Sequence, residues 1–120
     1  MDIQEAQLTI VLPFFDDAEG LTAVLPRLLS LPMVLSGACR LILVDDGSTD
    51  ASTNIALDYA KRYPKKVIYL EHSGHKNRGK SISRNLGFRN SKGYYVAFLD
   101  SDDVWLPRKI QEQVDILENH

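Results

Sequence analysis

Four short apolar runs, each followed by a segment of helical character, limit the folds open to this chain more than any other feature of its sequence. The runs span 8–12, where Pro13 ends the first run, and 40–44, 66–70 and 94–99. Helices are expected over 21–31 with a kink or restart at Pro26, over 51–63, over 80–90, and from Pro107 onward. Strands that alternate with helices predict an α/β, Rossmann-like fold, in which a mainly parallel sheet carries helices on both faces.

Composition places the chain among ordinary globular domains. Its 120 residues fit one domain, and 44% apolar beside 25% charged residues excludes disordered and collagen-like classes. The single cysteine, Cys39, forbids an internal disulfide and is expected to pack as a small apolar side chain. No apolar run reaches the ~18–20 residues of a membrane span, and the start of the chain lacks the pattern of a signal peptide. We therefore expect a cytoplasmic protein.

Polar clusters follow all four predicted strands. The clusters at 16–17, 45–50 and 100–103 are acidic, whereas the one at 73–80 is basic. Ligands of parallel α/β sheets bind beyond the carboxyl ends of the strands, so these clusters are expected to meet at one edge. Loops after strands are often polar, but that alternative leaves the separation of acidic from basic clusters unexplained. The sequence therefore predicts a ligand site at this edge.

The sharpest cluster is Asp100-Ser101-Asp102-Asp103, directly after the fourth apolar run. Carboxylates two residues apart in an extended segment point to the same side, so Asp100 and Asp102 can address one cation together. Mg²⁺ and Mn²⁺ take few protein carboxylates and complete their coordination with water and phosphate oxygens. The competing explanation is a turn and helix cap before Pro107.

A second cluster, from Val44 to Asp50, connects a strand to a helix. Gly47 permits a tight turn, and Ser48 or Asp50 can cap the helix that follows. Capping does not account for the doubled aspartate at positions 45 and 46. A carboxylate at the end of this strand is suited to accept hydrogen bonds from a nucleobase or ribose.

The third cluster is basic. Residues 61–92 contain ten Lys or Arg and one acid, while the rest of the chain contains four basic and fifteen acidic residues. The charges at 61–66 are expected to be solvated surface, whereas Arg78, Lys80 and Arg84 lie in a glycine-containing loop and first helical turn that suit a diphosphate. Neither a Walker A motif nor G-x-G-x-x-G is present. Few aromatic residues are interleaved with the charges, which disfavours nucleic acid as a partner.

Together, these motifs resemble family 2 glycosyltransferases of the GT-A fold. The resemblance rests on four segments in the family's order and spacing: Ile10-Val11-Leu12-Pro13-Phe14-Phe15, residues 43–50, Asn77 to Gly79 with Arg84-Asn85-x-Gly87, and Gly93-x-Tyr95-x-x-Phe98-Leu99 leading into the aspartates at 100–103. It implies a GT-A nucleotide-sugar-binding half-domain over 1–120 with strand order 3-2-1-4. The implied reaction transfers a sugar, with inversion, from a nucleoside diphosphate sugar to an acceptor hydroxyl in polysaccharide biosynthesis. A UDP-sugar is the expected donor.

The resemblance also implies roles for individual residues. Asp46 would contact the base, Asp100 would lie near the ribose or sugar, and Asp102 would bind Mn²⁺ or Mg²⁺. Phe15 and Asp17 stand where the family commonly has Tyr and Glu. The complete set of expected substrate-binding residues is Pro13, Phe15, Asp17, Asp46, Arg78, Lys80, Arg84 and Asp100.

The family's acceptor-binding region and carboxylate base lie beyond the D-x-D segment. The resemblance therefore implies that residues 1–120 stop short of both, and no catalytic base is assigned. The implied acceptor is a glycan, a lipid-linked molecule or another hydroxyl compound. Peripheral association of a longer protein with the inner face of the membrane is compatible with this interpretation.

Two other functions stay open at this point. One is a donor-binding module that performs no transfer, and the other is a sugar-1-phosphate nucleotidylyltransferase, which shares the sheet and uses a metal. The second requires a basic, glycine-rich loop after the first strand, whereas residues 13–17 are acidic.

Three further residues are given structural roles. His72 and His75 lack metal-ligand spacing and are expected to be solvated. Trp105 is expected to pack against the last helix rather than stack on a sugar.

Overall fold

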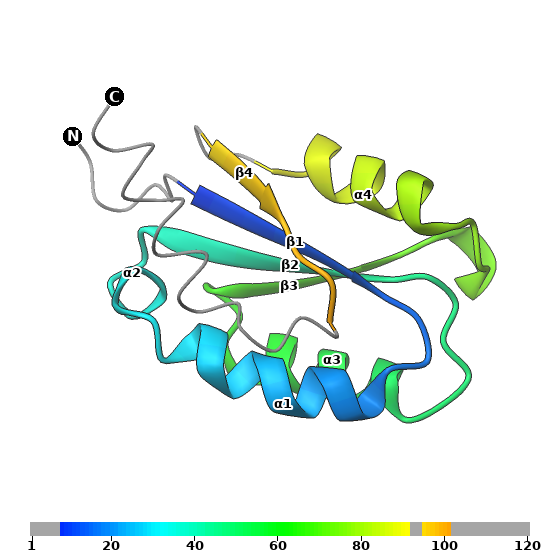
Figure 1. Ribbon diagram of the computed structural model, residues 1–120, viewed down its shortest axis with the longest axis horizontal. Helices are drawn as coiled ribbons and strands as arrows, with labels where there is room; N and C mark the ends of the chain where they lie inside the picture. The colour runs from blue at the N-terminus through cyan, green and yellow to red at the C-terminus, as the bar shows by residue number, and fades with distance from the viewer. Residues whose placement is uncertain (1–7, 92–94, 102–120) are drawn as a thin grey trace.

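The computed structural model describes residues 8–91 and 95–101. In this part of the chain, four parallel strands form one sheet in the order β3-β2-β1-β4, as the resemblance implied. The strands are β1 (Leu8–Phe14), β2 (Cys39–Asp45), β3 (Val67–Glu71) and β4 (Tyr95–Phe98). The order reverses at β1, because β2 lies on one side of it and β4 on the other (Figure 1).

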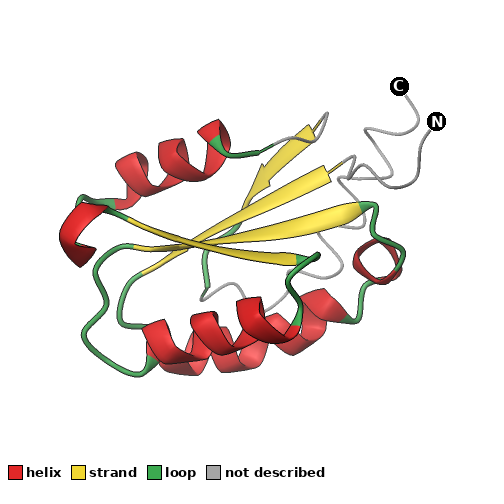
Figure 2. Cartoon of the chain, turned by 180° about the vertical axis from the view of Figure 1, so that it is seen from behind, coloured by secondary structure: helices red, strands yellow, loops and turns green. Residues whose placement is uncertain are grey.

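Helices cover both faces of the sheet. They are α1 (Ala18–Leu29), α2 (Pro32–Leu35), α3 (Ser52–Arg62) and α4 (Lys80–Arg89), and a short 3₁₀ turn, η1 (Ser73–His75), precedes α4. The two views show α1 and α3 on one face and α4 on the other (Figures 1 and 2). The predicted α/β fold with helices on both faces is therefore confirmed. Among the described residues, no helix is long and apolar enough to traverse a bilayer.

Strand β1 runs through Pro13, where the sequence predicted its end. Pro13 pairs with Val44, and the ladder to β2 continues as far as Phe14. Residues of a strand alternate in the side to which their backbone polar groups point. The carbonyl of Val11 accepts from Leu99 on the β4 side, so the nitrogen of Pro13 faces that side as well. Pairing with β4 has already ended at Val11, and the missing N–H therefore breaks no ladder bond.

Helix α1 begins and ends earlier than predicted and is not interrupted at Pro26. It starts at Ala18 because Asp17 caps it. Pro26 lies inside the helix, where burial of the face formed by Leu21, Leu25 and Leu28 outweighs the loss of one backbone bond. Strands β2, β3 and β4 and helices α3 and α4 agree with their predicted ranges to within about two residues, whereas α2 and η1 were not predicted. The predicted helix from Pro107 lies outside the described residues.

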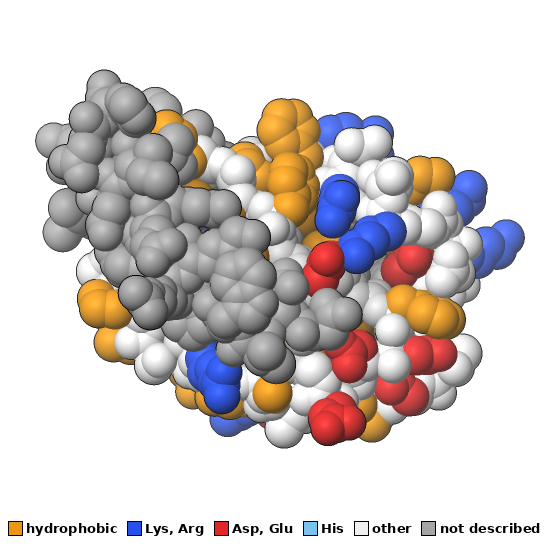
Figure 3. All heavy atoms as spheres, in the orientation of Figure 1, with side chains coloured by type: hydrophobic (Ala, Val, Ile, Leu, Met, Phe, Trp, Pro, Cys, Tyr) orange, Lys and Arg blue, Asp and Glu red, His pale blue; other side chains and the backbone are white. Residues whose placement is uncertain are grey.

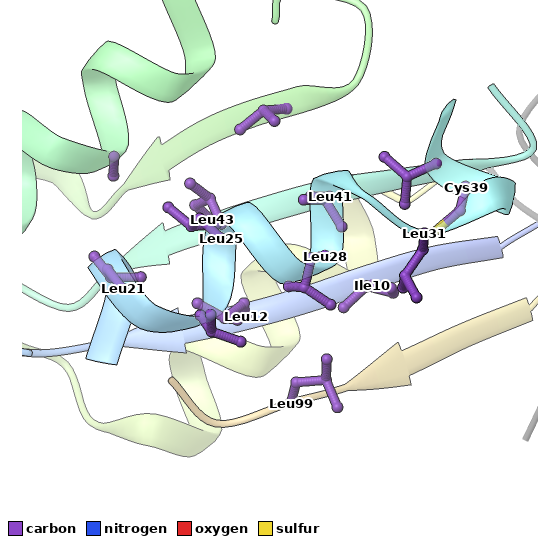
Figure 4. Packing of buried hydrophobic residues seen from close by; sticks show 14 of the residues in the cluster. Ile10, Leu12, Leu21, Leu25, Leu28, Leu31, Cys39, Leu41, Leu43 and Leu99 are labelled. Atoms are coloured by element: carbon purple, nitrogen blue, oxygen red, sulfur yellow. The ribbon is translucent and has the colours of Figure 1, made fainter. Parts of the chain in front are cut away.

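The main core lies between the sheet and helices α1 and α3 (Figure 4). Strand β1 is buried along its whole length, as expected for the central strand of a covered parallel sheet. On the opposite face, α4 packs closely on β1, because a Cβ at Gly87 would lie 2.3 Å from Cγ1 of Val11. Cys39 is buried in the main core, where desolvation raises the pKa of its thiol to about 12. The expectation of an inert, packed cysteine is confirmed.

Candidate functional site

The doubled aspartate at the end of β2 sends one carboxylate to each face of the sheet. Asp45 accepts hydrogen bonds from the hydroxyls of Thr53 (2.5 Å) and Tyr69 (2.9 Å), on the α3 side. Asp46 accepts one from the backbone N–H of Arg78 (2.6 Å), just before α4. This division follows from the alternation of side chains along a strand. It explains the second aspartate, which helix capping alone left unexplained.

Asp46 is held by the loop that precedes α4. The residue is only 5% exposed, and besides Arg78 the N–H of Gly79 donates to its Oδ2 at 3.1 Å. Gly47, the next residue, has a φ of 80°, and a Cβ there would lie 2.6 Å from the nitrogen of Asn77. Glycine at this position therefore lets the two loops meet closely enough for backbone amides to fix the Asp46 carboxylate.

The prediction that His72 is solvated was wrong. The residue is 9% exposed, because the chain after β3 folds against α4. Its Nε2 lies 2.9 Å from the hydroxyl of Ser83 on α4 and 3.6 Å from Oδ1 of Asp46. A single histidine in a predicted polar loop carries no periodicity from which this burial could be inferred.

Asp16 and Asp17 connect β1 to α1 and join neighbouring loops. Asp16 adopts a φ of 46° and accepts the N–H of Thr49 at 2.6 Å. Asp17 caps α1 by accepting the N–H of Gly20 at 3.0 Å. The hydroxyl of Ser101 donates to its other carboxylate oxygen. Asp17 thus links the end of β1 to the segment after β4.

Asp100 follows β4 and faces two basic side chains of α4. Its Oδ1 lies 2.7 Å from Nζ of Lys80 and 3.7 Å from Nη2 of Arg84. Lys80 and Arg84 are four residues apart on the helix, which places both on the same side. On the face seen in Figure 3, basic and acidic side chains adjoin one another.

These segments enclose a cavity of about 370 Å³ at the carboxyl ends of β1 and β4, which we call the pocket. Its lining residues are Pro13, Phe14, Phe15, Asp16, Asp17, Asp46, Lys80, Asp100 and Ser101. The volume is in the range of small-molecule sites, and the position is the reversal of strand order where parallel sheets bind ligands.

The structure brings most of the predicted substrate-binding residues to this pocket. Pro13, Phe15, Asp17, Asp46, Lys80 and Asp100 line it, while Arg84 contacts Asp100 and Arg78 contributes its backbone N–H to Asp46. Phe14, Asp16 and Ser101 line it as well, although they were not among the predicted substrate-binding residues. Asp102 and Trp105 lie outside the described residues. The metal role of Asp102, the packing of Trp105 and the binding roles of the residues at the pocket stay predictions.

The donor set of the pocket is suited to a divalent cation with a diphosphate. Four of the lining side chains are aspartates and one is a lysine. Carboxylate oxygens are the ligands preferred by Mg²⁺ and Mn²⁺, which also retain water and phosphate oxygens. Asp100, the first residue of the D-x-D segment, is one of these carboxylates.

On the α3 side of the sheet, a second polar group has a different character. We call Asp45, Thr53, Tyr69, Glu71 and His75 the α3-side network. One ligand atom each from Asp45, Glu71 and His75 lies within 4.8 Å of the others, a grouping able to hold an ion. The hydroxyl of Tyr69 already bridges the two carboxylates, at 2.9 Å from Asp45 and 2.7 Å from Glu71. Oδ2 of Asp45 and Oε2 of Glu71 are therefore already engaged in hydrogen bonds within the protein.

His75 completes this network, and its side chain is partly exposed although both ring nitrogens make contacts. Its Nδ1 lies 2.7 Å from Glu71 and its Nε2 lies 2.8 Å from the carbonyl of Ser48. Both ring nitrogens thus face acceptors, an arrangement satisfied when both carry a proton. The Ser48 carbonyl and then Glu71 raise the pKa of His75, while the Tyr69 hydroxyl and then His75 lower the pKa of Glu71.

Comparison with known proteins supports the family that the sequence motifs resemble. Residues 9–120 match the family model described as glycosyl transferase family 2. An uncharacterized glycosyltransferase of Escherichia coli, YibD, is 34% identical over 101 residues, which cover 84% of this chain and 27% of that protein.

Two solved structures show the likeness of fold. One is the mannosyltransferase PcManGT from Pyrobaculum calidifontis in complex with GDP-Man and Mn²⁺, with a TM-score of 0.74 and 21% identity. The other is Staphylococcus aureus TarS 1–349 in complex with UDP-GlcNAc, with a TM-score of 0.72 and 20% identity. The matches cover 89% and 95% of this chain but 30% and 32% of those chains.

The chain thus spans less than a third of the length of these relatives. With a family match over most of its length, and strands in the order that the motifs implied, the chain belongs to glycosyl transferase family 2.

Proposed function

We propose that this chain binds the donor of a glycosyltransferase, a nucleoside diphosphate sugar, in the pocket between β1 and β4. The observation that carries the proposal is the convergence of Asp46, Lys80 and Asp100 on one cavity. These residues come from three separate segments, namely the end of β2, the first turn of α4 and the chain after β4, and each has a charge suited to a different part of such a donor. The solved neighbours hold GDP-Man with Mn²⁺ or UDP-GlcNAc, which makes this donor class the first to test.

Asp46 is suited to the base of the donor. The amides of Arg78 and Gly79 fix its carboxylate, so the group is orientated before any ligand arrives. A carboxylate accepts a hydrogen bond from a ring N–H, which uracil and guanine both present and which a sugar or phosphate lacks. Of these two bases we propose uracil, as the resemblance to the family implied, and the comparison of UDP with GDP tests that choice.

Asp100 and the basic residues of α4 are suited to the polar half of the donor. Asp100 lies at the start of the D-x-D segment, where a carboxylate can accept hydrogen bonds from ribose or sugar hydroxyls. Arg84 and Lys80 place two positive charges beside it, where they can face the diphosphate. A divalent cation bound with Asp102 would act as a Lewis acid on the leaving nucleoside diphosphate.

The proposed reaction is displacement at the anomeric carbon by an acceptor hydroxyl, with inversion. The bond to the diphosphate oxygen breaks, and the oxygen leaves with the bonding electrons as the acceptor oxygen forms its bond to carbon. The base that takes the acceptor proton is assigned to no residue of this chain. Because the chain spans less than a third of its relatives, transfer is proposed for a protein that also supplies the acceptor site.

Calorimetric titration with UDP and GDP, with and without Mn²⁺, tests this proposal. We expect Mn²⁺-dependent binding of UDP that Asp100→Asn weakens by about tenfold or more, as loss of a charged contact implies. Asp58→Asn is the matched control, since Asp58 is exposed on α3 and pairs with Arg62. Absence of nucleotide binding by the folded protein would contradict the proposal. Release of pyrophosphate from UTP and a sugar 1-phosphate would instead indicate a nucleotidylyltransferase.

A further inference from the structure

The aspartates that line the pocket are balanced in two different ways. Asp16 and Asp46 accept backbone N–H groups, and Asp17 caps a helix and accepts a hydroxyl. Asp100 instead faces the ammonium of Lys80 at 2.7 Å and the guanidinium of Arg84 at 3.7 Å. The two basic side chains that face Asp100 can move, whereas backbone amides cannot leave their carboxylates without unfolding a loop.

Of these two cations, Lys80 is the one suited to move. Its side chain is 55% exposed, and that of Asp100 is 29% exposed, so their contact has the character of a surface ion pair, which contributes little net stability. The lysine ammonium sits on a flexible four-carbon stem. Arg84 is held more closely, because its Nε is buried, although no described residue accepts a hydrogen bond from it.

The charges of the proposed donor and its cation act on Lys80 in opposite directions. A divalent cation near Asp100 competes with the ammonium for the carboxylate and repels it. A diphosphate beside that carboxylate attracts the ammonium. Lys80 is the cation among the lining residues of the pocket, so both effects fall on the same side chain.

We propose that Lys80 is an exchangeable counter-ion of the pocket, paired with Asp100 when the donor is absent and transferred to the diphosphate when the donor and its cation bind. This inference rests on the proposed function. It assigns Lys80 two effects of opposite sign: Lys80 weakens binding of the free cation and strengthens binding of the nucleoside diphosphate. A lysine with a purely structural role would not show these opposite effects, because loss of structure on its removal would weaken the binding of both ligands.

The test compares Lys80→Met with the unaltered protein in two titrations. The first follows Mn²⁺ binding without nucleotide by the loss of the free-ion electron paramagnetic resonance signal. The second follows UDP binding in saturating Mn²⁺ by calorimetry. Removing the ammonium is expected to tighten Mn²⁺ binding by about two- to fivefold, the value of an exposed ion pair. It is expected to weaken UDP binding by at least as much.

Lys65→Met is the matched control, because Lys65 is exposed in the turn before β3, at the opposite end of the strands from the pocket. It removes the same charge and is expected to leave both affinities within about twofold. Thermal unfolding of both variants checks that the fold is retained, as expected for exposed lysines.

The outcomes separate this inference from the proposed function. If the unaltered protein binds UDP with Mn²⁺ but Lys80→Met leaves Mn²⁺ affinity unchanged or lowers it, the exchange is refuted and the donor site stands. A Lys80→Met protein that binds UDP as tightly as the unaltered protein refutes it equally. If the unaltered protein binds no UDP, the proposed function and the exchange both fail.

Discussion

The α3-side network at the ends of β2 and β3 and the pocket at the ends of β1 and β4 are both rich in charge, yet they differ in how that charge is held. In the α3-side network, two carboxylates, a hydroxyl of Tyr69 and the ring of His75 satisfy one another through short contacts. In the pocket, Asp100 faces the ammonium of Lys80 and the guanidinium of Arg84, and we propose that a ligand displaces the ammonium. Polar residues that hydrogen-bond to one another stabilise a fold, whereas a charged residue paired with a mobile side chain can exchange that partner for a ligand.

Asp45 and Asp46 allow a direct test of this difference, because Asp45 belongs to the α3-side network and Asp46 lines the pocket. Asp45 is fully buried and accepts hydrogen bonds from Thr53 and Tyr69 as well as from the N–H of Ser48. Asp45→Ala leaves the hydroxyl of Thr53 and the N–H of Ser48 without this acceptor, while Tyr69 keeps Glu71. We expect the free energy of unfolding to fall by about 2–4 kcal/mol. Urea unfolding measures it, and a loss below 1 kcal/mol would contradict the structural role.

Asp46 is expected to respond in the opposite manner. Asp46→Asn keeps the shape of the side chain and an oxygen for the amide of Arg78 or Gly79, so unfolding should change by about 1 kcal/mol or less. The carboxamide loses the charge with which the base contact is proposed, and UDP affinity should fall about tenfold. Calorimetry and urea unfolding of the same preparation give both numbers. Unchanged UDP affinity would remove Asp46 from the proposed donor site.

A smaller effect is expected from Tyr69, which bridges Asp45 and Glu71. Burial and the two carboxylates raise the pKa of this hydroxyl well above its ordinary value, so it stays protonated and donates. Tyr69→Phe removes that donor and is expected to cost about 1 kcal/mol of unfolding free energy. UDP binding should not change, because Tyr69 does not line the pocket. A loss of UDP binding in this variant would show that the two faces are coupled.

The smallest expected effect is a pH dependence that comes from His75. Since its pKa is raised above the ordinary 6.5, its contribution to stability is fully present below pH 6.5 and is lost as pH rises through the raised value. Glu71 has a lowered pKa, so its contribution is present above its ordinary 4.5 and is lost in more acidic solution. His75→Gln is expected to abolish the loss of stability that sets in as pH rises above 6.5, as followed by urea unfolding. An identical pH profile in both proteins would exclude this role.

Much of the fold could be predicted because it depends on local pattern. The apolar runs and helical segments are periodic in sequence, and the motif order implied the strand order that the structure shows. Pro13 and Pro26 were misjudged because each lies where its missing N–H costs little or is outweighed by burial. Both reasons depend on neighbouring helices and strands, whereas the prediction that proline ends a strand or kinks a helix uses only the local sequence.

The candidate site was predictable only where residue type carried the signal. Asp46 and Asp100 stand out as acids after buried strands, and both line the pocket. His72 was misjudged because its partner comes from α4, and the contacts of His75 with β3 and the loop after β2 were not anticipated. The η1 turn that positions them contains Gly74 at a φ of 72° and His75 at 55°. No spacing rule anticipates that geometry.

The most direct test of the contrast between the two faces is to locate the cation by nuclear magnetic resonance. Substoichiometric Mn²⁺ added with UDP broadens the amide signals of nearby residues. Our account requires the strongest broadening at the pocket, at Phe15, Asp100 and Ser101, with much weaker effects at Tyr69 and His75. Strongest broadening at Tyr69, Glu71 and His75 would place the cation in the α3-side network and contradict the account.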